Sequence, residues 1–184
     1  YNSFGQLTTK TQYAQRLAVN KLEGYSDKAI REIIKNSRED RHESYFYNHD
    51  NQLIETQKDA TRTYNPITKL YGKDIKSSTK NTYNAFGDLI KTSTRLNETQ
   101  WADSYNYYDA DGKKTAQIDA EGYLTTYQYT ALGECRQTTE YATRSNYWDT
   151  GFYREPLESK NDRIVVCTYD ALGQLITKTL KGVA

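Results

Sequence analysis

The sequence has few of the residues on which enzymes and membrane proteins depend. Its 184 residues include no methionine, two prolines, two cysteines and two histidines. No apolar run approaches the roughly 20 residues that span a bilayer, and no basic start followed by an apolar stretch marks a signal peptide. Because even an initiating methionine is missing, we expect the chain to be an internal piece of a longer protein.

An excess of charge of one sign is also missing. The sequence has 25 Lys and Arg residues against 24 Asp and Glu, a net charge of +1. Without a basic excess we predict neither nucleic acid nor an anionic membrane as a partner. Only 36% of the residues are apolar, and 18 tyrosines supply much of their bulk. We therefore expect a thin structure filled with tyrosine rather than a large aliphatic core.

The sequence contains instead a repeated phrase of seven residues, and repetition of this kind determines the fold class. The clear copies are YNSFGQL at 1–7, YNHDNQL at 47–53, YNAFGDL at 83–89, YDADGKK at 108–114, YTALGEC at 129–135 and YDALGQL at 169–175. Two weaker copies are YNPITKL at 64–70 and IDAEGYL at 118–124.

The phrase is typical of a β-hairpin turn. Asp or Asn in second position can accept a hydrogen bond from the amide two residues on, and the glycine three residues later takes the positive φ that ends a type I turn with a bulge. Asn51 replaces this glycine in one copy and tolerates that φ, whereas Thr68 in YNPITKL resists it. The structural turn residues that we predict are Tyr1, Gly5, Tyr47, Asn48, Asn51, Tyr83, Asn84, Gly87, Tyr108, Asp109, Gly112, Asp119, Gly122, Tyr129, Gly133, Tyr169, Asp170 and Gly173.

The segments between the turns alternate as strands do, for example at 123–129 and 165–169. We predict an all-β fold of consecutive antiparallel hairpins that form a curved, twisted sheet, with residues 1–184 as one structural unit. The tyrosines of successive repeats are expected to stack in ladders, with cross-strand aromatic pairs worth about 0.2–1 kcal/mol each.

A longer module occurs twice. TQYAQR at 11–16 and TEYATR at 139–144 each precede an irregular insertion, which falls at about 17–40 and at 145–161, and an Asp-Arg pair follows each insertion. Segment 26–37 places Ala29, Ile30, Ile33 and Ile34 on one helical stripe and predicts a short helix packed on the sheet. The second insertion is aromatic and is expected to be an ordered loop.

The segments YDALGQLITKT, YDADGKKTAQIDAEGYLTTYQYTALGE and DRIVVCTYD resemble the YD repeats of the RHS (rearrangement hot spot) family. This family occurs in bacterial polymorphic toxins, in the B and C components of insecticidal Tc toxin complexes, in wall-associated bacterial proteins and in animal teneurins. The resemblance covers essentially the whole chain. It implies a long sheet that spirals into a hollow shell, which in toxins encloses a C-terminal effector, and this chain would form an arc of the wall.

The resemblance further implies a non-enzymatic segment of a large secreted or surface-delivered bacterial protein. Its partners would be the rest of its own shell and an encapsulated effector. The core segment that ends such shells carries an Asp-Pro step, whereas the prolines here follow Asn65 and Glu155, so we do not expect that boundary in this chain.

Two further interpretations compete with the wall. One is a cell-surface adhesin or carbohydrate-binding module, with Trp148 and Phe152 in the second insertion as the candidate sugar-stacking residues. The other is a calcium-stiffened stalk, although DADG at 109–112 and DAEG at 119–122 lack the alternating ligands and distal Glu of a calcium loop. Unpaired sheet edges would also favour edge-to-edge self-association of the fragment.

Candidate catalytic and cofactor residues are few. His42 and His49 lie on opposite sides of a strand-to-turn junction, which is poor geometry for a shared metal or a triad. We therefore predict no catalytic residue, no metal and no cofactor. Cys135 and Cys167 lie near hairpin turns and would either pair or remain small buried thiols.

Overall fold

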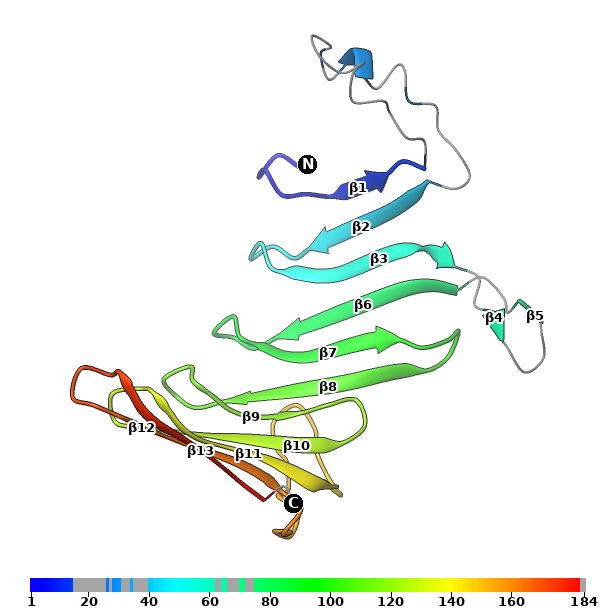
Figure 1. Ribbon diagram of the computed structural model, residues 1–184. Helices are drawn as coiled ribbons and strands as arrows, with labels where there is room; N and C mark the ends of the chain where they lie inside the picture. Colours follow the sequence, from blue (N-terminus) through cyan, green and yellow to red (C-terminus); the bar gives the residue numbers. More distant parts are fainter. Residues whose placement is uncertain are drawn as a thin grey trace. The chain divides into compact units, whose positions relative to one another are not determined.

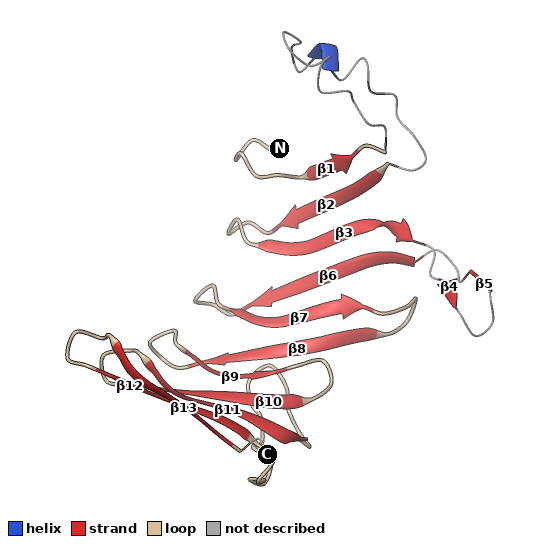
Figure 2. Ribbon diagram, in the orientation of Figure 1, coloured by secondary structure: helices blue, strands red, loops and turns tan. Residues whose placement is uncertain are grey.

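The structure is a computed structural model that describes residues 1–14, 26, 28–30, 34, 40–61, 64–65, 70–71 and 75–182. It confirms the predicted mainly-β fold of consecutive hairpins (Figures 1 and 2). An antiparallel sheet of 11 strands has the order β1-β2-β3-β6-β7-β8-β9-β10-β11-β12-β13. Its strands are β1 (Thr9–Gln12), β2 (Arg41–Tyr47), β3 (Leu53–Thr61), β6 (Ile75–Tyr83), β7 (Leu89–Arg95), β8 (Trp101–Tyr108), β9 (Lys114–Ile118), β10 (Tyr123–Tyr129), β11 (Cys135–Arg144), β12 (Arg163–Tyr169) and β13 (Leu175–Lys181).

The chain divides into two compact units, Tyr1–Lys80 and Asn81–Ala184. In the first unit, β1 pairs with β2, β2 with β3, and β3 with β6. The weak phrase at 64–70 lies outside this sheet, where β4 (Tyr64–Asn65) and β5 (Leu70–Tyr71) form a separate two-stranded sheet. In the second unit, every strand from β7 to β13 pairs with the next one along the chain.

A very short helix at 28–30 lies within the segment predicted to be helical. The Ser26 hydroxyl accepts a hydrogen bond from the Ala29 amide at 3.3 Å, as an N-cap residue does, and the Ser26 carbonyl accepts from the Ile30 amide at 3.0 Å. Most of the predicted helix, including Ile33, lies outside the described residues. Within the described part of the chain, no helix is long and apolar enough to cross a membrane.

The hairpin turns share one hydrogen-bonding pattern, which the turn at Asp170 illustrates. The Asp170 amide donates to the Gln174 carbonyl at 2.9 Å, and the Gly173 amide donates to the Asp170 carbonyl at 3.1 Å. The Asp170 carboxylate then accepts from the Leu172 amide at 2.9 Å and from the Gln174 amide at 2.8 Å. This is a type I turn closed by a bulge. The residues with positive φ in the equivalent position are Gly5, Asn51, Gly87, Gly112, Gly122, Gly133 and Gly173.

Turns that begin with a tyrosine occupy every second connection of the sheet. In the second unit these are the turns that open at Tyr83, Tyr108, Tyr129 and Tyr169. Because antiparallel strands reverse direction at each turn, these turns lie at one end of the strands, and the connections between them lie at the other end. The weaker copy at 118–124 is one of those other connections, and Ile118 in its first position is a buried core residue.

Among the described residues, the buried apolar core is small and lies in the second unit. It consists of Tyr107 on β8, Ala116 and Ile118 on β9, and Leu124 on β10, with Tyr105, Tyr141, Trp148 and Tyr153 packed against it in part. Trp148 and Tyr153 belong to the second insertion, so this loop covers the sheet and completes the core. The insertion is ordered, as the sequence indicates, and pairs internally through a bridge between Trp148 and Tyr153.

Two turn glycines allow the cost of a positive φ to be separated from the cost of displacing a packed side chain. Gly112 has φ +75° and open space around a built Cβ, whereas a Cβ at Gly122, φ +91°, would lie 2.8 Å from Cη2 of Trp148. We expect Gly112→Ala to destabilise the chain by about 1 kcal/mol, the cost of the left-handed region alone. Gly122→Ala should cost at least about twice as much because it also displaces the indole. Urea unfolding followed by circular dichroism would measure both, and equal losses would contradict the packing of Trp148.

Candidate functional site

Hydrogen bonds from tyrosine hydroxyls join several hairpins of the described chain to the preceding one. The donor is the hydroxyl of the tyrosine that begins a phrase. The acceptor is a backbone carbonyl in an earlier phrase, two residues after the residue with positive φ. Examples of this bond are Tyr47 to Leu7 at 3.0 Å, Tyr108 to Leu89 at 3.1 Å, Tyr129 to Lys114 at 2.7 Å and Tyr169 to Cys135 at 2.8 Å. The same chemistry therefore recurs in the same register along the sheet.

Each of these bonds closes the open end of a strand pair. Strands β9 and β10 are connected by the turn at 119–122, and Tyr129 binds the Lys114 carbonyl at the opposite end. Strands β11 and β12 are connected by the second insertion, and Tyr169 binds the Cys135 carbonyl at the opposite end. A pair of strands thus has a covalent turn at one end and a tyrosine bond at the other.

This arrangement differs from the tyrosine ladders that the sequence analysis predicts. The phrase tyrosines lie on every second strand, and strands are about 4.8 Å apart, so two such rings are separated by about 9.6 Å. Aromatic pairs need centroids within about 7 Å. For Tyr47, Tyr108, Tyr129 and Tyr169 the link between repeats is therefore a hydrogen bond to the backbone, not a ring contact.

A buried aspartate closes the base of each insertion. Asp162 is 2% exposed, and its carboxylate accepts from the Ala142 amide and the Ser159 amide, both at 2.8 Å. In the first module, Asp40 is 7% exposed and accepts from the Ala14 amide at 2.9 Å. These residues are the Asp of the repeated Asp-Arg pair and the Ala that follows Tyr13 or Tyr141. The structure thus explains the longer module, which sequence reasoning recognised without assigning it a role.

Tyr107 fastens the second insertion to the sheet. It lies in the core on β8, and its hydroxyl donates to the Asp149 carbonyl at 2.7 Å and to the Phe152 carbonyl at 3.2 Å. Its ring packs against that of Tyr153, with centroids 4.6 Å apart. Burial raises the pKa of Tyr107, with a smaller contribution from Asp149. The phenol therefore stays protonated and keeps its role as a donor.

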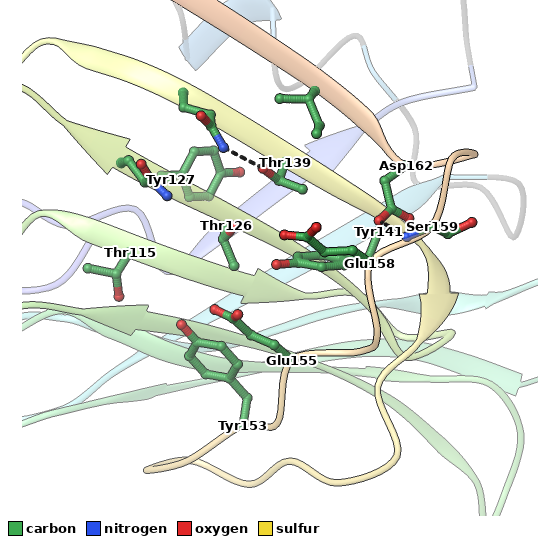
Figure 3. A pocket seen from close by; sticks show the side chains of 13 residues that line it. Thr115, Thr126, Tyr127, Thr139, Tyr141, Tyr153, Glu155, Glu158, Ser159 and Asp162 are labelled. Atoms are coloured by element: carbon green, nitrogen blue, oxygen red, sulfur yellow. Dashed lines mark hydrogen bonds between the residues drawn. The ribbon is translucent and has the colours of Figure 1, made fainter. Parts of the chain in front are cut away.

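A cavity of about 280 Å³ lies between the second insertion and the sheet (Figure 3). Its walls come from β9 to β12 on one side and from residues 153–162 on the other. The lining is mainly polar and includes Tyr127, Tyr141, Tyr153, Glu155 and Glu158. Burial raises the pKa of Tyr127, Tyr141 and Tyr153. The second insertion thus creates a polar cavity against the sheet that is partly open to solvent.

The two candidate sugar-stacking residues lie in different surroundings. Trp148 is half-buried, with its indole against Gly122 and the core, so it is not the exposed platform that the sequence suggested. Phe152 is 54% exposed and pairs with Tyr147, which is 52% exposed, at a centroid distance of 5.8 Å. Tyr147 and Phe152 therefore form the exposed aromatic pair of the insertion.

His42 and the turn carboxylates have local partners. His42 Nδ1 lies 2.9 Å from Asp59 Oδ2, which also accepts from the His42 amide at 2.6 Å. These hydrogen bonds, led by the one from the side chain, lower the pKa of Asp59. Asp109 and Asp119 each accept two backbone amides within their own turns. In the described ranges no group of three His, Cys, Asp or Glu residues could hold a metal ion. Cys135 and Cys167 are free and half-buried.

Comparison with protein-family models and with curated proteins finds no match. Among solved structures, the chain is similar to one in the crystal structure of TcdB2-TccC3-Cdc42, with a TM-score of 0.31 and 15% sequence identity. The likeness covers 76% of this chain and 9% of that chain. A likeness of this size concerns the backbone alone and places the chain in no family.

The tyrosine bonds can be tested with two variants at the same position of the repeat. Tyr129→Phe removes the hydroxyl that binds the Lys114 carbonyl and should destabilise the chain by about 1 kcal/mol. Tyr1→Phe is the control, because Tyr1 is 84% exposed and its hydroxyl has no partner among the described residues. Urea unfolding should separate the two variants. Equal stabilities would contradict a stabilising role for the bond.

The buried tyrosines predict a loss of stability at alkaline pH. Burial raises the folded-state pKa of Tyr107 and Tyr153, so folding holds their protons more tightly than the unfolded chain does. The associated stability is complete below the unfolded pKa of about 10 and is lost as pH rises from there through the folded pKa. Unfolding free energies measured between pH 8 and pH 11.5 should fall less steeply in Tyr107→Phe than in the unmodified chain. If the two curves of unfolding free energy against pH were parallel, the ionisation of Tyr107 would not contribute to the loss of stability.

Proposed function

We propose that this chain is a non-enzymatic wall segment of a large secreted bacterial protein of the RHS type, in which the hairpin sheet encloses a C-terminal toxin or effector. The observation that supports this best is the repeated bond from a tyrosine to the preceding hairpin. Such a bond lets hairpins be added one after another without a large core between them. A wall built this way would be stiff and thin, as an enclosing shell requires.

The free edge of β13 supports the same proposal. All seven residues of β13 are exposed, and they include Leu175, Ile176 and Leu180. Leu175 lies two residues after Gly173. In earlier repeats, the carbonyl of the residue in this position accepts a hydrogen bond from a tyrosine hydroxyl. Among the described residues, no tyrosine hydroxyl donates to the Leu175 carbonyl. This strand would therefore receive a further hairpin of the same kind.

The turns support a structural rather than a catalytic role. Asp109, Asp119 and Asp170 use a carboxylate oxygen to bind two amides of their own turn. One oxygen of each carboxylate is thereby used to hold the turn together, which is a structural role. We propose no cofactor for the chain.

A second candidate function is a carbohydrate-binding adhesin. The exposed pair of Tyr147 and Phe152 favours it, because aromatic faces that protrude from a loop can stack on sugar rings. The two functions need different surfaces. A wall uses its sheet edges to continue and its inner face to hold cargo, whereas an adhesin uses the aromatic pair.

Hydrogen-deuterium exchange would test the wall. In the isolated chain, amides of β13 should exchange quickly because the strand has one neighbour. In the full-length protein they should be protected by about tenfold or more, since a further hairpin covers the free edge. Strand β10, which has neighbours on both sides, is the control and should be protected in both samples.

Limited proteolysis of the full-length protein gives the second measurement. The C-terminal region should resist digestion while the wall is intact and become sensitive when Tyr129→Phe and Tyr169→Phe are combined. Fast exchange of β13 in both samples, together with immediate digestion of the C-terminal region, would reject the wall. Binding to immobilised glycans that Phe152→Ala abolishes would then favour the adhesin.

A further inference from the structure

The cavity under the second insertion has charge of one sign only. Among the 13 described residues that line it, three are acidic, namely Glu155, Glu158 and Asp162, and none is Lys, Arg or His. The Asp162 carboxylate is already bound by the Ala142 and Ser159 amides. Two carboxylates, those of Glu155 and Glu158, therefore remain for a ligand.

Neither of these glutamates has a partner among the residues that the structure describes. In the parts that the structure describes, Glu155 and Glu158 form no ion pair and no side-chain hydrogen bond. The ion pair nearest to them in sequence joins Arg163 to Glu140, which leaves that arginine occupied. Figure 3 shows both carboxylates directed into the space between the insertion and the strands. Glu155 and Glu158 are exposed, so water solvates their carboxylates in the free chain, and a ligand with positive charge would replace that water as their partner.

Tyrosines supply the rest of the wall. Tyr127 and Tyr141 line the cavity from the sheet, and Tyr153 lines it from the insertion. Burial, followed by the nearby Glu155 carboxylate, raises the pKa of Tyr141 and of Tyr153. These phenols therefore stay neutral, and a neutral ring attracts a cation through its electron-rich face. Carboxylates combined with aromatic faces suit an organic cation that carries an apolar stem.

Other classes of ligand fit this lining less well. A divalent metal ion needs three or more converging ligands, and the described residues contain no group of three that could hold one. A phosphate or sulfate would be repelled by Glu155 and Glu158. A neutral sugar could use the hydrogen-bonding groups but would leave both carboxylates without a counter-charge.

We propose that this cavity binds an alkylammonium group on an apolar stem, the chemistry of a lysine side chain. Glu155 and Glu158 pair with the ammonium group, while Tyr127, Tyr141 and Tyr153 surround the stem. Such a group could belong to a polypeptide that the wall contacts or to a free amine. The site depends on the second insertion and on the unit that contains it, and it is independent of whether a cargo is enclosed.

Titration of the chain with Nα-acetyl-lysine methylamide, followed by NMR of the backbone amides, would test the proposal. We expect saturable shifts at Thr126 and Tyr127 that weaken as salt is added. The combined Glu155→Gln and Glu158→Gln variant should bind about tenfold more weakly or worse. Glu121→Gln is the matched control, since it removes one exposed carboxylate from a turn that does not line the cavity.

Two further probes distinguish the source and the class of ligand. A short peptide with a central lysine that binds about tenfold more tightly than the lysine derivative would indicate a polypeptide partner, and equal affinity would indicate a free amine. The Nζ-acetylated derivative, which keeps the stem but lacks the charge, should not bind. The proposal is overturned if this neutral probe binds as well as the charged one, if methyl glucoside alone saturates the site, or if nothing saturates. The thermal melt of the double variant should match that of the unmodified chain, and if it does not, the Glu158→Gln single variant provides the same comparison.

Discussion

The hydrogen bond from a tyrosine hydroxyl to the backbone of the previous hairpin is the interaction on which this sheet depends. A chain of hairpins holds its strands together covalently at only one end of each pair, and the other end would separate without an additional contact. Tyr129 and Tyr169 supply that contact at the strand ends opposite a short turn and a long insertion respectively. Since the bond does not involve the connection itself, the connection can vary in length without loss of register. This accounts for a repeat whose turns are nearly identical and whose spacing is irregular.

The second insertion is also held by a small number of hydrogen bonds to backbone groups. Asp162 binds amides on both sides of its base, and Tyr107 holds its middle through two carbonyls, so a loop without regular structure is fixed at three positions. The bare backbone of Gly122 lets Trp148 approach closely and add its indole to the core. These contacts bury polar groups with partners, which keeps the cost of burial low. The loop is thereby part of the folded unit and can present a defined surface.

The sequence predicts those parts of the structure that short-range chemistry determines. The second residue of the phrase and its positive-φ residue act within five residues, and the turns therefore form where the phrase occurs. The strand at 123–129 has the predicted bounds for the same reason. The links observed at Tyr47, Tyr108, Tyr129 and Tyr169 are hydrogen bonds and not the predicted ring stacking, because the spacing of the phrase places these tyrosines on alternate strands. The position of Trp148 and the cavity depend on contacts between residues far apart in sequence, such as Tyr107 with Asp149, and no local pattern reveals them. The repeated Asp-Arg pair is the sequence feature that could have revealed the role of Asp40 and Asp162. Two copies at equivalent distances from a turn indicate that both aspartates make the same kind of contact.

The second insertion, where the repeat is interrupted, is the part of the described chain that we propose for ligand recognition. In the regular hairpins, a side-chain oxygen of Asp170 binds amides of its own turn and the Tyr169 hydroxyl binds the preceding strand, so these groups are already engaged. The second insertion differs because Glu155 and Glu158 remain unpaired and Phe152 remains exposed. A repeat protein can change such a loop without disturbing the sheet, provided that the aspartate at its base and the tyrosine at the far end are kept. The regular part would therefore provide the wall, and the insertion would provide whatever selectivity that wall has.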